Sequence, residues 1–433
     1  MHRYFDFAGK KTSYKQETIA GITTFLTMAY IIIVNPAILE SIGIPKGASI
    51  TATIVTAVFG TLVMGIYARR PFAIAPYMGE NAFIVFTVVK GMGFPWQTAL
   101  GAIFLAGALF TVLTIFKVRS WLANAIPRSL KHSFAIGIGL FLTFIGLNEI
   151  GFVAIGVPGA PVTLGNVSAP STLLAILGFL ITAWLLVMKI PGALIAGILV
   201  TTVLSVVTGV TPLPSEIVSL PPSLAPIFGQ LDIRGALTLK ALPIVVIVFV
   251  MVFVDTIGTL IGLSARAGLL DEHGNLPEIE KPMLADALAN LVAPLLGTTT
   301  SGAYVESAAG IEEGGRTGFT AIVVAALFAM SLFLAPLFTA IPPHAYGIAL
   351  IAIGILMIAP IAQLDFSDYT ELIPAFLTIV LISFTYNIGV GMTAGLLIYP
   401  VLKLVTGRVK EVPPPLWLLA AMSLGFYLVY PYR

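Results

Sequence analysis

The sequence contains no cysteine and few histidines, and both absences narrow its chemistry. Without cysteine the chain can form no disulfide, no thiol nucleophile and no thiolate metal site. The four histidines stand near the N terminus or at the ends of predicted segments, and their spacing gathers no set of metal ligands. We therefore expect neither a metal centre nor a bound cofactor.

Charge is also scarce in this chain. Only 10% of the 433 residues are charged, 58% are hydrophobic, and the mean hydropathy is +1.03. This composition lies far outside that of soluble globular proteins. Apolar segments follow one another with short polar joints from Glu17 to Leu404, which predicts a single membrane domain. The residues before Glu17 are too polar for a secretory signal, so we expect the first helix to be retained.

The length of the apolar segments predicts how often the chain crosses the membrane. A spanning helix requires about 20 apolar residues, and fewer when it is half of a broken pair. The sequence predicts fourteen segments, at residues 18–39, 48–67, 73–90, 97–116, 132–150, 171–188, 191–209, 240–263, 283–297, 300–312, 317–338, 345–361, 371–387 and 389–405. A last apolar stretch, Leu416–Tyr430, is short and aromatic, and it either crosses the membrane or lies at its surface.

The distribution of basic residues predicts the orientation of these segments. When the N terminus is placed in the cytoplasm, most Lys and Arg residues fall on the cytoplasmic side, as the positive-inside rule requires. The exceptions include Lys46, Lys90, Arg234 and Lys240. The sequence thus predicts a multi-pass protein of the cell membrane with a cytoplasmic N terminus.

The two halves of the chain resemble each other. Ile190–Gly209 aligns with Ile388–Gly407 at an offset of 198 residues, and nine of the twenty aligned positions are identical. A second match, at an offset of 226, places Glu80-Asn81-Ala82 over Glu306-Ser307-Ala308. Seven segments per half, an odd number, give the two copies opposite orientations in the membrane. We predict an all-α membrane protein with a 7+7 inverted repeat, an architecture of secondary transporters.

Two segments at matching positions are interrupted. Segments 3 and 10, at residues 73–90 and 300–312, are opened by irregular stretches that contain Pro76 and Gly302. We predict that each is a half-helix preceded by a short strand, and that the two half-helices face each other near the bilayer midplane.

Three acidic residues, Glu80, Asp255 and Glu306, stand inside apolar segments. A carboxylate at the bilayer centre costs about 2.5–3.5 kcal/mol on insertion scales, so it indicates a cavity, a partner or a proton. The alternative is a carboxylate at a helix end that reaches water. In surroundings of low dielectric constant, one of these acids can carry a proton at neutral pH, which predicts proton coupling without a cofactor.

The segment around Asp255 also contains small residues that could admit a ligand. Asp255, Thr259 and Gly262 share one helical face, and small side chains there leave room for a flat molecule. Close packing of helices is the alternative explanation for the glycine. The amide of Asn81 could bind a ligand or join two helices. The sequence has no phosphate-binding loop for ATP, and Gly314-Gly315-Arg316 is typical of a turn.

Several motifs resemble one family, the AzgA-type purine permeases of the nucleobase:cation symporter (nucleobase:ascorbate transporter) superfamily. The resemblance covers nearly the whole chain and is carried by Glu17–Tyr30, Val34-Asn35-Pro36, Ala75-Pro76 with Gly79 and Asn81-Ala82-Phe83, Asp255–Leu260, Leu284–Leu288, Glu306–Gly310 and Gly314–Gly318. The last two blocks are highly specific to this family.

The resemblance implies a core domain and a gate domain, often in a homodimer. The core would comprise residues 1–126 and 240–340, and the gate would comprise residues 127–239 and 341–433, including the C-terminal apolar segment. The resemblance also implies that Asp255, Glu306 and Asn81 bind the nucleobase and that proton symport drives uptake. Two carboxylates can accept hydrogen bonds from the N–H groups of a purine edge.

The chain departs from the family pattern near this site. Many members have a further acid at the position of Val252, an apolar residue at that of Glu80 and a small one at that of Tyr77. We hypothesise that Glu80 partly replaces the missing acid in proton coupling.

Three classes of function can be compared with the residues of this chain. Proton-coupled uptake of adenine, guanine or hypoxanthine agrees best with them. An anion transporter of the same architecture, for sulfate or bicarbonate, is the alternative, but an anion site should present helix N-termini and a cation rather than two acids. An intramembrane enzyme or a channel would need a catalytic dyad, a metal set or a filter repeat. We expect a transporter and not an enzyme.

Overall fold

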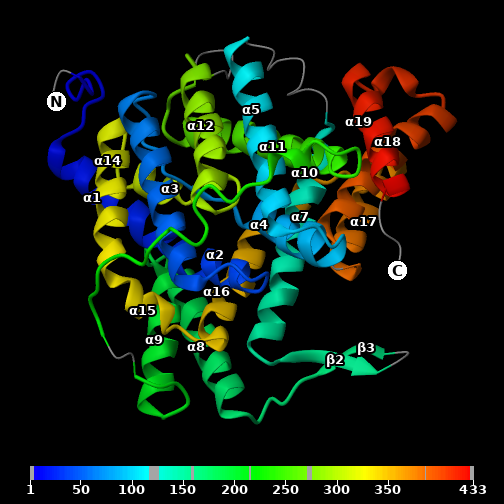
Figure 1. The fold of residues 1–433 in the computed structure, drawn as a ribbon. Coiled ribbons are helices and arrows are strands. Elements are labelled where there is room, and N and C mark those ends of the chain that lie inside the picture. Colours follow the sequence, from blue (N-terminus) through cyan, green and yellow to red (C-terminus); the bar gives the residue numbers. More distant parts are fainter. Residues whose placement is uncertain are drawn as a thin grey trace.

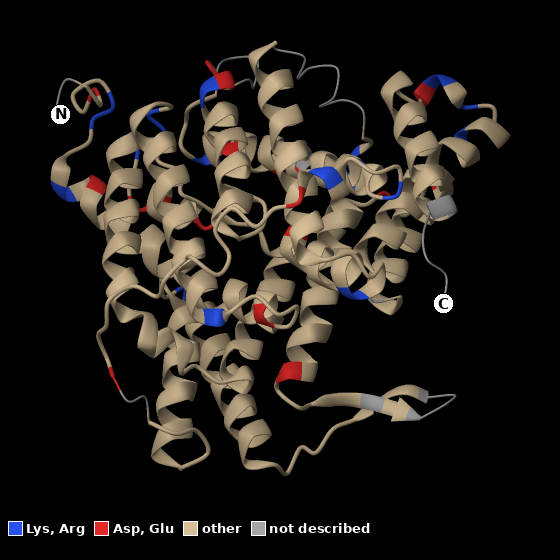
Figure 2. Cartoon of the chain, in the orientation of Figure 1, with Lys and Arg blue, Asp and Glu red and all other residues tan. Residues whose placement is uncertain are grey.

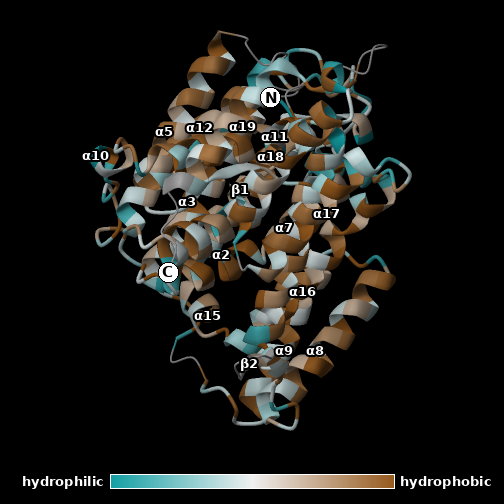
Figure 3. Cartoon of the chain, turned by 90° about the vertical axis from the view of Figure 1, so that its right-hand side faces the viewer, coloured by the Kyte–Doolittle hydropathy of each residue, from teal (hydrophilic) through white to brown (hydrophobic). Residues whose placement is uncertain are grey.

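The structure, a computed structural model, describes residues 4–116, 126–157, 160–213, 216–270, 276–385 and 387–429. Within these ranges, nine helices are long and apolar enough to cross a membrane. The helices form one bundle, from which a β-hairpin projects (Figure 1). The helices are largely hydrophobic, and hydrophilic residues gather in the joints (Figure 3). Such a chain is a helical membrane protein.

One group of helices comes from the first and third quarters of the chain. In the first quarter these are α1 (Tyr14–Met28), α2 (Ile31–Glu40), α3 (Lys46–Ile66), α4 (Met78–Ala82), the π-helix η1 (Phe83–Gly91) and α5 (Trp96–Ile115). In the third they are α11 (Leu242–Arg266), α12 (Glu280–Leu296), α13 (Ser307–Glu312), α14 (Gly318–Ser331), η2 (Leu332–Leu334) and α15 (Ala335–Thr339). α3 packs against α12 and α14, and α5 packs against α11 and α12.

The second group comes from the second and fourth quarters. It contains α7 (Arg128–Glu149), α8 (Pro170–Val187), α9 (Ala193–Val207), α16 (Pro343–Met357), η3 (Ala359–Gln363), α17 (Tyr369–Phe384) and α18 (Ile388–Val405). α7 packs against α16 and α17, while α9 packs against α8 and α16. The short helix α10 (Ile233–Ala236) packs instead against α5 of the first group.

The halves of the chain repeat each other in detail at α9 and α18. These helices contain most of the two stretches that align at the offset of 198 residues. Each is followed by a glycine with positive φ, Gly209 at +76° and Gly407 at +74°. This left-handed conformation favours glycine and commonly ends a helix. The local geometry thus repeats along with the sequence.

The predicted short strands are present in both interrupted segments. β1 (Ile74–Pro76) precedes α4, β4 (Ser301–Ala303) precedes α13, and the two strands pair antiparallel with Ala75 opposite Gly302. Extended backbone inside a bilayer must find partners within the protein. Besides the ladder, Thr61 exchanges hydrogen bonds with the backbone of Ile74, with lengths of 2.9 and 3.1 Å.

Buried polar side chains also hold the second strand. The Asn290 side chain binds the backbone N–H and C=O groups of Ser301, at 3.0 and 2.6 Å. Ala303 donates its N–H to Asp286 Oδ2 at 3.2 Å. These contacts fix the position at which the half-helix α13 begins, and with it the position of Glu306.

Glu17 caps the N-terminal end of α14. It is fully buried, and its carboxylate accepts hydrogen bonds from the N–H of Arg316 and from the N–H and hydroxyl groups of Thr317 and Thr320. A helix N-terminus attracts negative charge through its unpaired N–H groups. The Gly-Gly-Arg-Thr-Gly motif is therefore the turn that brings α14 onto Glu17, which agrees with its interpretation as a turn.

A second pair of strands, which forms a β-hairpin, was missing from the all-α expectation. β2 (Val153–Val157) and β3 (Ala160–Leu164) pair antiparallel between α7 and α8, with Val153 opposite Leu164. The hairpin projects from the bundle at the end opposite the N terminus (Figure 1).

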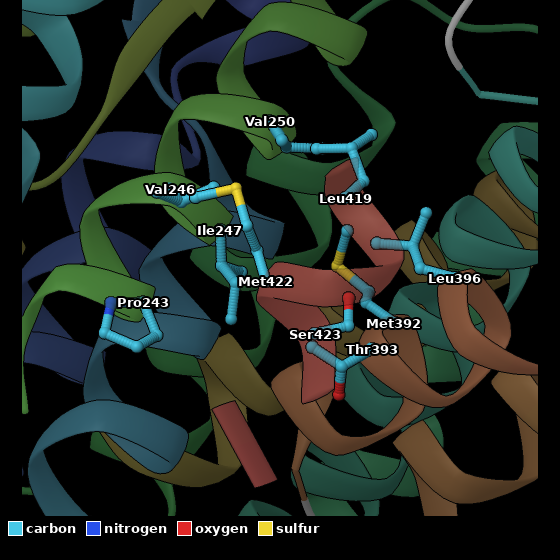
Figure 4. A pocket seen from close by; sticks show the side chains of 10 residues that line it. All are labelled: Pro243, Val246, Ile247, Val250, Met392, Thr393, Leu396, Leu419, Met422 and Ser423. Carbon is cyan, nitrogen blue, oxygen red and sulfur yellow. The ribbon is translucent and has the colours of Figure 1, made fainter. Parts of the chain in front are cut away.

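The last apolar stretch forms a helix, α19 (Pro414–Val429), after the short turn η4 (Val409–Glu411); Tyr430 lies outside the described residues. α19 packs against α18 of the second group and α11 of the first. A cavity of about 20 Å³ remains where the three helices meet, and Met392 and Met422 border it (Figure 4). Flexible methionine side chains suit such irregular packing. α19 therefore contacts both groups of helices.

Candidate functional site

The predicted site residues lie where α11 meets both interrupted segments. α11 carries Asp255 and Thr259, α4 carries Glu80 and Asn81, and Glu306 is the residue before α13. α11 packs against α4, β4 and α13. The antiparallel strands thus bring both half-helices to the same side of α11.

Glu80 and Asp255 are neighbours. Their carboxyl groups are electrostatic neighbours, one on α4 and the other on α11. Glu80 is 1% exposed, and neither of its oxygen atoms accepts a hydrogen bond from a donor group of another described residue. Asp255 lies on the exposed face of α11. Two carboxylates this close, one of them buried, repel each other strongly when both are ionised.

Glu306 is held by a tyrosine instead of by the other acids. Tyr30 donates its hydroxyl to Glu306 Oε1 at 2.6 Å. Tyr30 stands in the break between α1 and α2, where the chain leaves one helix and starts the next. Thr27 Oγ1 donates to the Glu306 backbone carbonyl at 3.3 Å. The first helical segment is therefore interrupted where it meets the half-helix α13.

Two tyrosine rings from the crossing strands are parallel. Tyr77 follows β1 and Tyr304 follows β4, and their ring centroids lie 6.4 Å apart with an interplanar angle of 9°. Tyr304 donates its hydroxyl to the Pro76 carbonyl at 2.5 Å, and both Glu80 and Glu306 are its electrostatic neighbours. Gly302 leaves room for the Tyr77 ring, because a Cβ at this position would lie 2.2 Å from Tyr77 Oη and would displace the ring.

Asn81 belongs to a buried amide network. It donates through Nδ2 to Asn35 Oδ1 at 2.6 Å, and Asn35 in turn donates to Thr53 at 2.7 Å and to Thr298 at 2.9 Å. The Asn81 Oδ1 atom is buried and accepts no hydrogen bond from the described residues. Asn81 therefore joins helices and still has a free acceptor.

Sequence reasoning did not assign a role to Asp286. This residue is fully buried on α12; besides the hydrogen bond from Ala303, its carboxyl group has Tyr77 and Thr256 as neighbours. Asp286 thus lies between Ala303 of β4, Thr256 of α11 and Tyr77, the residue that follows β1. Its position as an acid within the predicted segment 283–297 was the signal that could have identified it. Tyr30 and Tyr304 gave no such signal, because tyrosines are common in membrane helices.

A cavity of about 390 Å³ separates the two groups of helices next to this site. One wall is α7, with Arg128, Lys131 and His132, and Gln363 of η3 also borders the cavity. The other wall is α11, with Phe253, Ile257, Gly258 and Ile261.

Asp255 itself does not line this cavity, although Phe253 and Ile257, two residues before and after it, do. A Cβ built on Gly258 or on Gly262 would have no atom within 4 Å, so both glycines face open space. Thr259 is half-buried and does not line this cavity. On the helical face of α11 that the sequence predicted, Asp255 and Gly262 are exposed, and Gly258 is exposed beside them. Thr259 is half-buried and lies at the edge of this exposed surface.

Two solved membrane proteins share this fold. The transmembrane domain of the cyanobacterial bicarbonate transporter BicA superposes with a TM-score of 0.65 at 15% identity, covering 88% of this chain and 97% of that one. The structure of SLC26A9 gives a TM-score of 0.62 at 10% identity, covering 94% and 68%. The chain therefore has the inverted-repeat transporter fold of these proteins.

Sequence comparison identifies the family. The permease family (Xan_ur_permease) matches residues 15–394, and the chain belongs to it. MJ0326 of Methanocaldococcus jannaschii is 48% identical, covering 100% of this chain and 98% of its own length. The adenine permease AdeP of Escherichia coli is 40% identical (96% and 93% covered), and the guanine/hypoxanthine permease PbuG of Bacillus subtilis is 38% identical (99% and 99% covered). The chain is a permease and not an enzyme, as the sequence predicted.

Proposed function

We propose that this permease takes up a purine nucleobase, such as adenine, guanine or hypoxanthine, together with a proton across the cell membrane. The observation that carries the proposal is the buried Glu80 on α4, where α4 packs against α11, the helix of Asp255, which also packs against the half-helix that starts after Glu306. Full-length relatives named as adenine and guanine/hypoxanthine permeases support the choice of cargo.

In this proposal Asp255 and Glu306 accept hydrogen bonds from the N–H groups of the base. Each purine presents N–H donors on its edge, and charged acceptors make the stronger hydrogen bonds. Asn81 offers a further acceptor through Oδ1, and Thr259 contributes a hydroxyl group at the edge of the same helical face. The parallel rings of Tyr77 and Tyr304 provide flat apolar surfaces, which suit an aromatic cargo.

The proton is carried by the acidic pair. Because Glu80 is buried beside Asp255, one proton shared by the two carboxyl groups removes their repulsion. Ionisation of both groups becomes favourable only when water or the cargo reaches the buried Glu80. Glu80 thereby supplies the acid that many family members have at the position of Val252. Glu306 takes part in the proton coupling through its hydrogen bond with Tyr30.

The architecture that we propose has fourteen membrane segments in a 7+7 inverted repeat. Residues 1–126 and 240–340 form the core, residues 127–239 and 341–433 form the gate, and the N terminus is cytoplasmic. The packing of helices into two groups supports the division. Lys and Arg residues are more numerous at the end of the bundle that carries the N terminus, which supports the orientation (Figure 2). In this orientation Arg128 and Lys131, which line the 390 Å³ cavity, stand at the cytoplasmic end of α7.

The anion-transporter alternative rests on fold alone. BicA and SLC26A9 are 15% and 10% identical to this chain. The acids at the proposed site disfavour an anionic cargo by electrostatic repulsion.

The test is uptake of radiolabelled purines into proteoliposomes with an imposed proton gradient. We expect uptake of at least one purine to depend on the gradient, and Asp255→Asn and Glu306→Gln to abolish it while the protein remains folded. Glu80→Gln should retain binding of the base but lose its coupling to protons. Undiminished proton-coupled uptake in Glu80→Gln would remove Glu80 from the mechanism, and sulfate or bicarbonate transport without purine transport would favour the alternative.

A further inference from the structure

Tyr30 lies buried at the break of the first helical segment. α1 ends at Met28 and α2 begins at Ile31, so Tyr30 belongs to neither helix. Tyr30 is 2% exposed, and its hydroxyl group donates to Glu306 Oε1 at 2.6 Å. This is the only hydrogen bond that the Glu306 carboxylate accepts from another described residue. Two segments that lie 276 residues apart therefore meet at this one bond.

No neighbouring group can replace Tyr30 as the donor. The hydroxyl group of Tyr304, which follows β4, is donated to the Pro76 carbonyl at 2.5 Å. No basic side chain of the described residues forms an ion pair with Glu306. Glu306 is half-buried, and its Oε2 atom accepts no hydrogen bond from these residues. The carboxylate thus has one oxygen held by Tyr30 and one that is left for a ligand.

The same stretch of chain orients a side chain of the other half-helix. Asn35 lies on α2, and its Oδ1 atom accepts the Asn81 amide N–H at 2.6 Å. Asn81 is left with an oxygen that accepts nothing from the described residues. Tyr30 and Asn35 therefore each bind one atom of a proposed cargo ligand and leave one acceptor oxygen. Supporting contacts of this kind hold the groups of a binding site in the geometry that binding requires.

We propose that Tyr30 is a positioning residue for cargo binding, which holds Glu306 Oε1 so that Oε2 faces an N–H group of the purine. Without the Tyr30 hydroxyl the carboxylate turns freely, and the cargo must immobilise it on binding. Ordering one flexible side chain lowers the affinity about 2- to 10-fold. This inference rests on the proposed function, because it takes the ligand to be a purine base.

The test is equilibrium binding of radiolabelled adenine, guanine and hypoxanthine to the purified chain. Tyr30→Phe keeps the ring and removes the hydroxyl, so we expect it to weaken binding of the cargo base about 2- to 10-fold. p-Aminophenylalanine at position 30 keeps a donor at the same place and should restore the affinity. Tyr399→Phe is the matched control, because Tyr399 is 3% exposed and donates its hydroxyl to Glu371 at 2.7 Å within the second group of helices. This variant should bind the base as the wild type does.

Combination with Glu306→Gln distinguishes the orientation of Glu306 from support of the fold. In Glu306→Gln the Tyr30 hydroxyl holds the amide oxygen, so the NH₂ group faces the N–H group of the base. Removing the hydroxyl lets the amide turn its oxygen to the base. The double variant Tyr30→Phe/Glu306→Gln should therefore bind at least as tightly as Glu306→Gln alone.

Three results overturn the inference. Unchanged affinity in Tyr30→Phe would remove this residue from the site. A further loss of affinity in the double variant, as large as that in Tyr30→Phe alone, would show that Tyr30 only supports the break between α1 and α2. Failure of p-aminophenylalanine to restore binding would show that the missing donor is not the cause of the loss. A wild-type chain that binds none of the three bases would instead refute the proposed function, and this inference with it.

Discussion

Replacing Glu17 by Gln should destabilise the junction between α1 and α14 without changing side-chain size. Four of the hydrogen bonds, from the N–H and hydroxyl groups of Thr317 and Thr320, converge on Oε2, and the fifth, from the Arg316 N–H, reaches Oε1. A glutamine can present its oxygen to the first set, but its NH₂ group then faces the Arg316 N–H. A buried unsatisfied donor costs about 1–3 kcal/mol.

The lost charge adds to this effect. Interaction of an anion with a helix N-terminus contributes about 0.3–1 kcal/mol, and up to about 2 kcal/mol when it is partly buried. The sum predicts a loss of about 1–5 kcal/mol in the free energy of unfolding for Glu17→Gln. Thermal unfolding of the purified chain in detergent measures the change, which should lower the midpoint by several degrees.

A matched variant controls for the removal of a carboxylate near the same junction. Glu313 is exposed. Its backbone carbonyl accepts a hydrogen bond from Gln16, but its side chain accepts none from the described residues. Glu313→Gln should therefore leave the midpoint unchanged. Equal midpoints for Glu17→Gln and Glu313→Gln would refute the capping argument.

Three further predictions concern the site and the loop after α18. Gly258→Ala should be tolerated, because its Cβ meets no atom within 4 Å, whereas Gly258→Leu should fill the open space and lower purine uptake; equal uptake by both variants would show that the cargo does not pass there. Gly302→Ala should displace the Tyr77 ring, whose Oη would lie 2.2 Å from the new Cβ, and weaken purine binding about tenfold, measured by equilibrium titration; unchanged affinity would remove the ring from the site. A hydrogen bond from Arg408 holds the pKa of Glu411 at about 2, below its ordinary 4.5, so this contact stabilises the fold above about pH 4.5 and is lost as the pH falls toward 2. The thermal midpoint of the wild type should fall more steeply over that range than that of Glu411→Gln, and parallel curves would contradict the assignment.

Local pattern predicted much of the fold. The repeat between Ile190–Gly209 and Ile388–Gly407 corresponds to two helices that are both followed by a positive-φ glycine. The interruptions near Pro76 and Gly302 correspond to the paired strands, because irregular residues in an apolar segment mark a helix that cannot continue. The hairpin at 153–164 was missed, since its strands are apolar on both faces and lack the alternation that identifies a strand.

The site was predicted less completely. An acid in an apolar segment can be recognised without a structure, which is why Glu80, Asp255 and Glu306 were selected. Their partners depend on how distant segments align. The contact between Glu80 and Asp255 follows from the packing of α4 on α11, and the bond from Tyr30 to Glu306 spans 276 residues. No local pattern contains that information.

The claim that Asp255 and Glu306 hold a purine is tested most directly by equilibrium binding. Radiolabelled adenine, guanine and hypoxanthine are titrated onto the purified chain, onto Asp255→Asn and Glu306→Gln, and onto Glu313→Gln as the control. We predict that one of these bases binds the wild type and the control equally, and that each of the other two variants weakens its affinity at least about tenfold through the loss of one charged acceptor. Unchanged affinity in both carboxamide variants, with folding intact, would contradict the account.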